Sequence, residues 1–216
     1  MEINTILNYV IQIAVLLFAV SVHESAHGWM AEKFGDPTAR MQGRITLNPI
    51  AHIDPIGSII FPIILAIMHA PVFGWAKPVI VNPYNLRDYR RANRFISAAG
   101  PGSNIITASV GVGLFLLLKR INIGILANSS GFEVGGLILL NLIIINLYLA
   151  IFNLIPIPPL DGSHILESLL HGDALYNYQK LKPYGFIILL LVIYTGVLNI
   201  IARPILTFVV SILLRG

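Results

Sequence analysis

Long apolar stretches separated by short polar ones make up most of the chain. Four of them are long enough to form membrane-spanning helices, because a helix needs ~20 apolar residues to cross the ~30 Å hydrocarbon layer of a bilayer. They cover residues 4–31, 95–118, 133–154 and 183–201. Stretches 54–70 and 203–214 are also apolar but short, and Pro62 interrupts the first of them. The pattern predicts an all-α polytopic membrane protein with about four to six transmembrane or re-entrant helices.

The composition supports this interpretation. Hydrophobic residues make up 56% of the chain and charged residues only 11%, with a mean hydropathy of +0.80, whereas a soluble domain carries about 25% charged residues. The net charge of +4 comes from basic residues between the apolar stretches, where they orient a membrane protein rather than bind nucleic acid. The sequence contains no cysteine, which excludes disulfides and thiolate metal sites. Glu2 is the only charge before His23, so we expect a retained first helix rather than a cleaved signal peptide.

The run His23-Glu24-Ser25-Ala26-His27 closes the first apolar stretch. On a helix, imidazoles four residues apart share one face and can bind one metal ion. Glu24 projects nearby and can take a proton from water at that metal. The structural alternative is a helix end wetted by interfacial polar residues. Ionisable residues inside a span are costly, however, and this cost favours a functional centre.

A catalytic zinc usually takes three protein ligands and leaves a position for water. Asp161 is the strongest candidate for the third ligand, because it follows a proline break where a new helix would begin and negative charge is favoured. His164 and Glu167 follow at helical spacing and are competitors. His164 also fits a role in contacting a ligand residue rather than the metal.

The path of residues 54–70 decides the topology. Asp161 emerges beside His23 and His27 if this stretch dips into the membrane and returns, and on the other face if it crosses fully. We favour the re-entrant path, because it places ten basic residues on the active-site side of the membrane and four on the other side. By the positive-inside rule this predicts a cytoplasmic active-site face. The ten are Lys33, Arg40, Arg44, Lys77, Arg87, Arg90, Arg91, Arg94, Lys180 and Lys182, and the four are Lys119, Arg120, Arg203 and Arg215.

Two further motifs accompany the histidine run in a fixed order. They are Ala98-Ala-Gly-Pro-Gly-Ser-Asn104 and Asn153-Leu-Ile-Pro-Ile-Pro-Pro-Leu-Asp161-Gly. Together the three motifs resemble the signatures of the site-2 protease family of intramembrane zinc peptidases, over about residues 15–170. The resemblance implies one zinc ion per chain held by His23, His27 and Asp161, with Glu24 as the catalytic base.

Residues 43–57 resemble the compact bacterial branch of that family, which lacks PDZ and CBS domains. This resemblance implies a multi-pass protein of the bacterial cell membrane. We therefore expect a single domain over residues 1–216, with a catalytic core at about 4–170 and C-terminal helices at 183–214.

Asn104 has two interpretations. It fits an N-cap or a polar contact between helices, and it equally fits a group that binds substrate near a close backbone approach at Gly100 and Gly102. The resemblance, in which a matching asparagine lies near the active centre, favours substrate binding.

His52, Asp54 and residues 73–83 lie in the polar surroundings of the short apolar stretch. His52 and Asp54 fit either a structural turn or a supporting role beside the metal ligands. Residues 73–83 predict a short membrane-associated β segment between turns, which is either an interfacial loop or an edge that pairs with an unwound substrate.

These observations predict hydrolysis of peptide bonds in or near the transmembrane segments of membrane-protein substrates, with the lipid bilayer as the surrounding partner. The alternative function is a non-proteolytic metal-binding or transport protein that uses the same two histidines and Asp161. A transporter more often shows repeated halves, and this sequence shows none. A second alternative is a peptidase with Glu133 or Glu167 as the third ligand.

Overall fold

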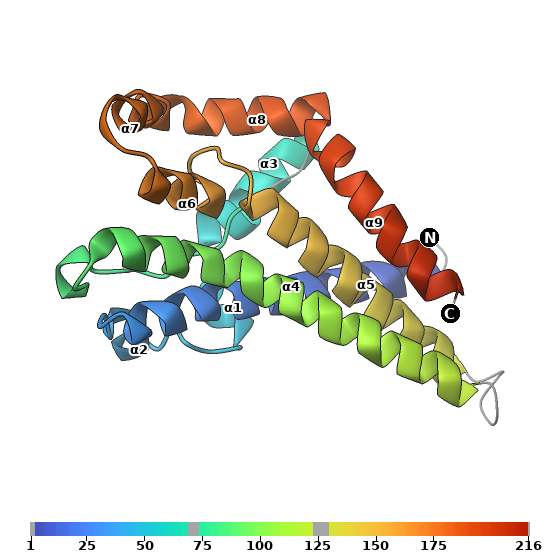
Figure 1. Ribbon diagram of the computed structural model, residues 1–216. Helices are drawn as coiled ribbons and strands as arrows, with labels where there is room; N and C mark the ends of the chain where they lie inside the picture. The colour runs from blue at the N-terminus through green and yellow to red at the C-terminus, as the bar shows by residue number, and fades with distance from the viewer. Residues whose placement is uncertain (1–2, 69–73, 123–129, 216) are drawn as a thin grey trace.

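The computed structural model describes residues 3–68, 74–122 and 130–215, and its regular elements there are all helical (Figure 1). The α-helices are α1 (Ile3–Lys33), α2 (Thr38–Met41), α3 (Phe61–Ile67), α4 (Tyr89–Asn122), α5 (Ser130–Asn153), α6 (Asp161–Leu169), α7 (Gly172–Gln179), α8 (Gly185–Thr195) and α9 (Val197–Arg215). Short helical turns are η1 (Pro49–His52), η2 (Pro55–Ile60), η3 (Pro83–Asn85) and η4 (Lys182–Tyr184). The predicted all-α class is confirmed for the described part of the chain.

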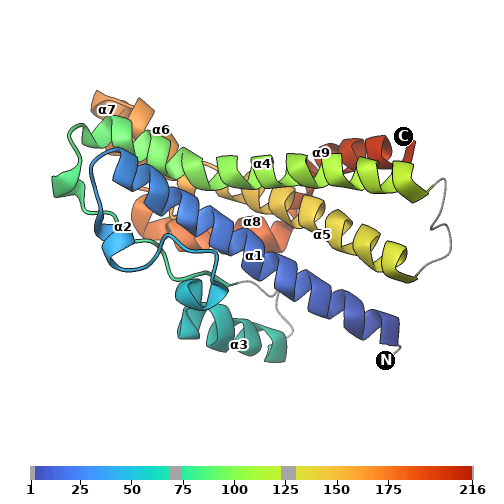
Figure 2. The same ribbon diagram turned by 90° about the horizontal axis from the view of Figure 1, so that it is seen from below.

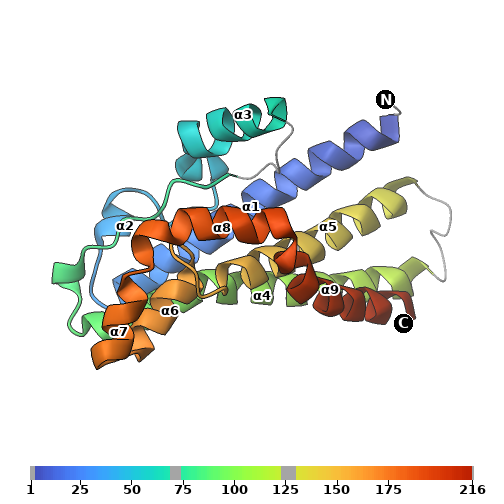
Figure 3. The same ribbon diagram turned by 90° about the horizontal axis from the view of Figure 1, so that it is seen from above.

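Helices α1, α4 and α5 form the core, and each packs against the other two (Figures 1 and 2). All three are long and apolar enough to cross a membrane. Their contact surfaces use small side chains: Ala19, Ala108 and Ala150 are buried. Small residues let helix backbones approach closely in lipid, where close packing and polar contacts hold helices together. Helices α2, α6 and α7 lie at one end of this core, and both termini lie at the other (Figures 1 and 3).

The stretch predicted to re-enter forms η2 and α3, which lie on the α1 side of the bundle (Figures 2 and 3). These two elements contain 6 and 7 residues, which gives about 20 Å of helix and is too short to cross ~30 Å of hydrocarbon. The chain then comes back to its starting level, because the Trp75 amide donates to the Gly57 carbonyl at 3.1 Å and the Lys77 amide donates to the His52 carbonyl at 2.8 Å. This return supports the re-entrant path over a full crossing.

The predicted span at 183–201 is wrong as a continuous helix. Gly196 adopts φ +71°, a left-handed conformation that ends α8. The segment of α8 and the segment of α9 meet at 59°. The C-terminal region is therefore a bent pair, which counts as a fourth candidate span only when both parts are taken together.

No strand is present among the described residues, so the β segment expected at 73–83 is not found in residues 74–82. The reason lies in where the backbone amides point. Those of Trp75 and Lys77 donate to the re-entrant region, that of Val79 donates to the Glu24 carboxylate, and that of Asn82 donates to the buried Asp36 carboxylate. Residues 74–82 form an extended strap that is bound to four separate groups instead of to a neighbouring strand.

Candidate metal centre

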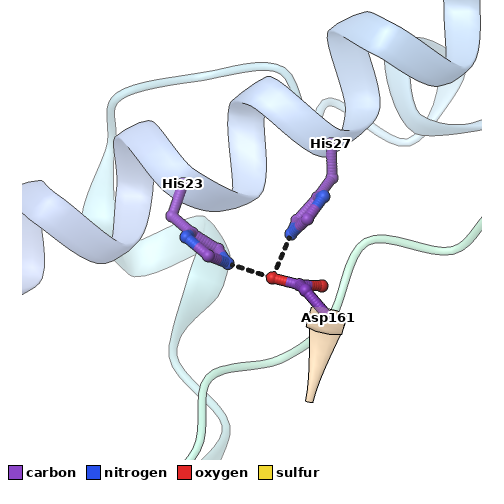
Figure 4. A group of neighbouring side chains, drawn as sticks. All are labelled: His23, His27 and Asp161. Atoms are coloured by element: carbon purple, nitrogen blue, oxygen red, sulfur yellow. Dashed lines mark ion pairs between the residues drawn. The ribbon is translucent and has the colours of Figure 1, made fainter. Parts of the chain in front are cut away.

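His23 and His27 lie on one face of α1, and Asp161 at the start of α6 faces both of them (Figure 4). The Nε2 atoms of His23 and His27 lie 3.1 and 3.4 Å from Asp161 Oδ2. The three residues form a group whose ligand atoms are all within 4.8 Å of one another. The structure thus brings together the three residues expected from the sequence to bind a metal. His23 and Asp161 are 138 positions apart along the chain.

The tautomer of each histidine follows from its second ring nitrogen. His27 Nδ1 lies 2.7 Å from the Ile96 carbonyl oxygen, which can only accept, so Nδ1 carries the proton. His23 Nδ1 lies 2.6 Å from Asn104 Oδ1 and donates in the same way. Both Nε2 atoms therefore turn a lone pair towards Asp161, which is the form in which histidine binds a metal.

The arrangement fits a bound cation. Asp161 Oδ2 is buried and has no hydrogen-bond donor among the described residues, although two nitrogen lone pairs face it. Adjacent ligands of a tetrahedral zinc lie about 3.3 Å apart, given metal–ligand distances of ~2.0 Å. The two observed separations, 3.1 and 3.4 Å, bracket this value.

Gly100 on α4 leaves the space in which the metal would lie. A Cβ atom on this residue would be 2.4 Å from His27 Nε2 and 2.6 Å from His23 Nε2. Gly102, two positions later, would meet nothing within 4 Å. The close backbone approach expected for this glycine motif is therefore made by Gly100 alone.

Glu24 lies on the same turn of α1 as His23 and is half-buried. The Val79 amide of the strap donates to Glu24 Oε2 at 3.1 Å. This contact holds one carboxylate oxygen in place beside the histidines and leaves the other oxygen available as a proton acceptor.

Comparisons with known proteins agree with this centre. The family model described as "Peptidase family M50" matches residues 123–194, which include Asp161. A Bacillus subtilis protein named "Putative zinc metalloprotease YwhC" is 39% identical over 195 residues, covering 90% of this chain and 84% of the relative. The chain belongs to peptidase family M50. This is the site-2 protease family.

More distant M50 relatives match over nearly the same length. A Mycolicibacterium smegmatis protein named "Putative zinc metalloprotease Rip2" is 26% identical over 191 residues, which is 88% of this chain and 69% of the relative. The protein of the same name from Mycobacterium tuberculosis strain H37Rv is 27% identical over 191 residues. No solved structure matches the chain. The relatives therefore support a zinc metalloprotease of the M50 family.

The remaining residues singled out in the sequence lie outside the group of metal-binding atoms. His52 is buried and bonds through Nε2 to the Thr46 carbonyl at 2.9 Å, and Asp54 caps η2 through the amides of Ile56 and Gly57. Both residues hold the turns that precede the re-entrant segment. His164 has a side chain that is 43% exposed and lies 4.0 Å from Glu167.

A glutamate as third ligand is not supported by this M50 centre. Glu167 forms an ion pair with Lys182 at 2.7 Å and accepts a hydrogen bond from Gln179. Glu133 lies in the first turn of α5, about 30 Å of helix away from the end that leads to Asp161.

The Asn104 side chain is directed at protein groups. Its side chain is fully buried and binds His23, the Ala19 carbonyl and Asn146. Both amide protons are used, which favours a role in positioning His23 over the predicted contact with substrate. The sequence interpretation also missed Asn146, whose signal was an amide in an otherwise apolar span.

Proposed function

We propose that this M50 protein is an intramembrane zinc metalloprotease that hydrolyses peptide bonds in or near transmembrane segments of membrane proteins. One observation carries the proposal. Two Nε2 lone pairs and a carboxylate oxygen converge at the end of a spanning helix, with a glutamate on the same helical turn. His23, His27 and Asp161 would hold one zinc ion per chain.

Each residue has a defined task in this proposal. When bound, zinc would polarise the scissile carbonyl and lower the pKa of a water from ~15.7 to ~7. Glu24 would carry the proton of the reaction: it would accept it on the carboxylate oxygen that does not bind the Val79 amide and pass it to the leaving amine. The two histidines keep their orientation during this transfer, because His23 and His27 are each held at Nδ1.

A transmembrane substrate must unwind locally, because a helix hides its carbonyls in hydrogen bonds. The strap at 74–82 lies beside Glu24 and has an extended backbone. Its alternate amides at Trp75, Lys77 and Val79 point into the protein, so the main-chain groups of Ala76 and Ile80 point the other way. We propose that this outer edge pairs with the unwound segment of the substrate.

The basic residues support a cytoplasmic position for the centre. Lys33, Arg40 and Arg44 follow the histidine-bearing end of α1, and Arg87, Arg90 and Arg91 lie around the start of α4 at the same end of the bundle. This excess of positive charge is typical of a cytoplasmic face. We propose a multi-pass protein of the bacterial cell membrane with its active site on that side.

The proposal is tested with purified protein in detergent, using Glu24→Gln and a panel of labelled single-span peptides. We expect the wild type to bind one zinc and cleave at least one peptide, and Glu24→Gln to keep zinc while its cleavage falls by about 100-fold or more. Glu32→Gln is the matched control, because Glu32 lies two turns later on α1 and pairs with Arg40 at the surface.

Cleavage by Glu24→Gln at the wild-type rate contradicts the proposed mechanism. Zinc flux into proteoliposomes without any peptide cleavage would instead favour the transport alternative. A wild type without stoichiometric zinc rules out both.

A further inference from the structure

A chain of buried amide side chains links the three core helices to His23. Asn104 on α4 and Asn146 on α5 both have no exposed surface. Asn104 Oδ1 lies 2.6 Å from His23 Nδ1, and Asn104 Nδ2 donates to Asn146 Oδ1 at 2.8 Å. Asn146 Nδ2 in turn donates to the Leu142 carbonyl at 2.8 Å.

The direction of every hydrogen bond in this chain is determined by its ends. The Leu142 carbonyl can only accept, so Asn146 must turn its NH2 group towards it and its Oδ1 towards Asn104. The Ala19 carbonyl, 3.1 Å from Asn104 Nδ2, imposes the same orientation on Asn104. Asn104 Oδ1 is then left for His23 and requires the proton on Nδ1.

The two histidines differ in what holds them. His27 is held by the main-chain carbonyl of Ile96 and needs no special side chain. His23 is held by a side chain, and that side chain is held by a second one on another helix. Burying two amides inside a membrane protein is costly unless they are fully paired, and leucine would fill similar volume without that requirement.

We propose that Asn104 and Asn146 are a coupled pair of positioning residues that set the tautomer and ring orientation of His23 for metal binding. This inference rests on the proposed zinc site. Asn104 acts directly on His23, whereas Asn146 acts only through Asn104. Loss of a partner that orients a metal-bound histidine lowers metal affinity by about 10–100-fold.

The test measures zinc affinity by competition with a chelator for Asn104→Leu, Asn146→Leu and the double variant, each purified in detergent. Leucine keeps the number and branching of the side-chain heavy atoms and removes the hydrogen bonds. We expect about 10–100-fold weaker zinc binding for Asn104→Leu and a smaller loss, about 3–10-fold, for Asn146→Leu, because Ala19 still orients Asn104. The double variant should match Asn104→Leu, since Asn146 has no route to His23 without Asn104.

Two further readouts separate positioning from packing. The visible spectrum of cobalt in the site should change in Asn104→Leu, because the coordination of His23 changes. Asn141→Leu is the matched control on α5: its amide donates only within its own helix, to the Leu137 carbonyl, so zinc affinity should stay at the wild-type value.

Several outcomes overturn the proposal. The first is a wild-type zinc affinity in Asn104→Leu. The second is a double variant whose loss of zinc affinity is the product of the two single losses. The third is a loss of zinc affinity in Asn141→Leu as large as that in Asn146→Leu. If Asn104→Leu does not fold, Asn146→Leu with the cobalt spectrum decides. If the wild type binds zinc, cleavage requires Glu24 and neither asparagine substitution changes the zinc affinity, only this inference is removed. If the wild type binds no zinc, the proposed function is removed as well.

Discussion

The two halves of α1 differ in composition and in surroundings: His23, Glu24, His27, Glu32 and Lys33 all lie in the C-terminal half, and the N-terminal half has no charged residue. In the N-terminal half, Ile6, Val10 and Ile13 are 47%, 57% and 59% exposed. In the C-terminal half, Ala19 and Ala31 have no exposed surface and His23 has 5%. The N-terminal half buries Ile11 and Val15 and leaves its other side exposed, whereas the C-terminal, enclosed half is contacted by α4, the strap and the loop that follows α2.

This difference explains where a polar centre can be built. The enclosed half is lined with small residues: a Cβ on Gly28 would meet Ala39 at 2.9 Å, and one on Gly100 would meet both imidazoles. Close approach lets polar side chains find partners on neighbouring elements, as in the pair of Ser25 Oγ and the Thr46 carbonyl at 2.6 Å. The enclosed half should therefore tolerate far fewer substitutions than the N-terminal half.

Gly100→Ala, on α4 beside the enclosed half of α1, should have the largest effect on the candidate metal centre. The added methyl group occupies the space between the two Nε2 atoms, so we expect loss of stoichiometric zinc and of all cleavage. Gly102→Ala is the matched control and should keep both, since no atom lies within 4 Å of its Cβ position. Elemental analysis of the two purified variants checks this, and equal zinc in both would show that Gly100 does not shape the site.

Val79→Pro tests the contact between the strap and Glu24. Proline suits an extended backbone but has no amide proton, so the hydrogen bond to Glu24 is lost. We expect kcat to fall by about 10–100-fold while zinc content stays at the wild-type value.

Val79→Ala removes most of the side chain but keeps the amide, and its kcat should remain within a few-fold of wild type. Steady-state kinetics on a cleaved peptide measures both variants. Equal loss in the two would assign the effect to the side chain and not to the amide.

The smallest expected effects compare one substitution in each half of α1. Ala31→Leu adds bulk where Leu86, Ala92 and Ile96 already pack, and overpacking costs about 1–3 kcal/mol. Val10→Leu adds one methylene to an exposed side chain and should change stability by less than about 0.5 kcal/mol. Thermal unfolding in one detergent compares them, and similar midpoints would mean that the two halves are equally constrained.

The residue pattern predicted much of this architecture for a physical reason. Crossing a bilayer demands long apolar runs, so the spans α1, α4 and α5 are visible without coordinates. A spacing of four on a helix places His23 and His27 on one face whatever surrounds them. Asp161 was selected by its chemistry and by the proline break before it, and the short stretch at 54–70 was expected to return because only that path places Asp161 beside the histidines.

Other features depend on how helices are rotated and packed, which hydropathy does not specify. Asn146 and Asn141 look alike in the sequence, yet only Asn146 points at Asn104, because the rotation of α5 in the core decides which side chain meets α4. The anchoring of the strap on Glu24 likewise arises from a contact between distant segments. The sequence by itself determined which residues can bind a metal in a membrane. The tertiary structure decided the tautomers of the two histidines, the groups that hold them and the space that Gly100 leaves beside them. Each of these features is set by partners far along the chain.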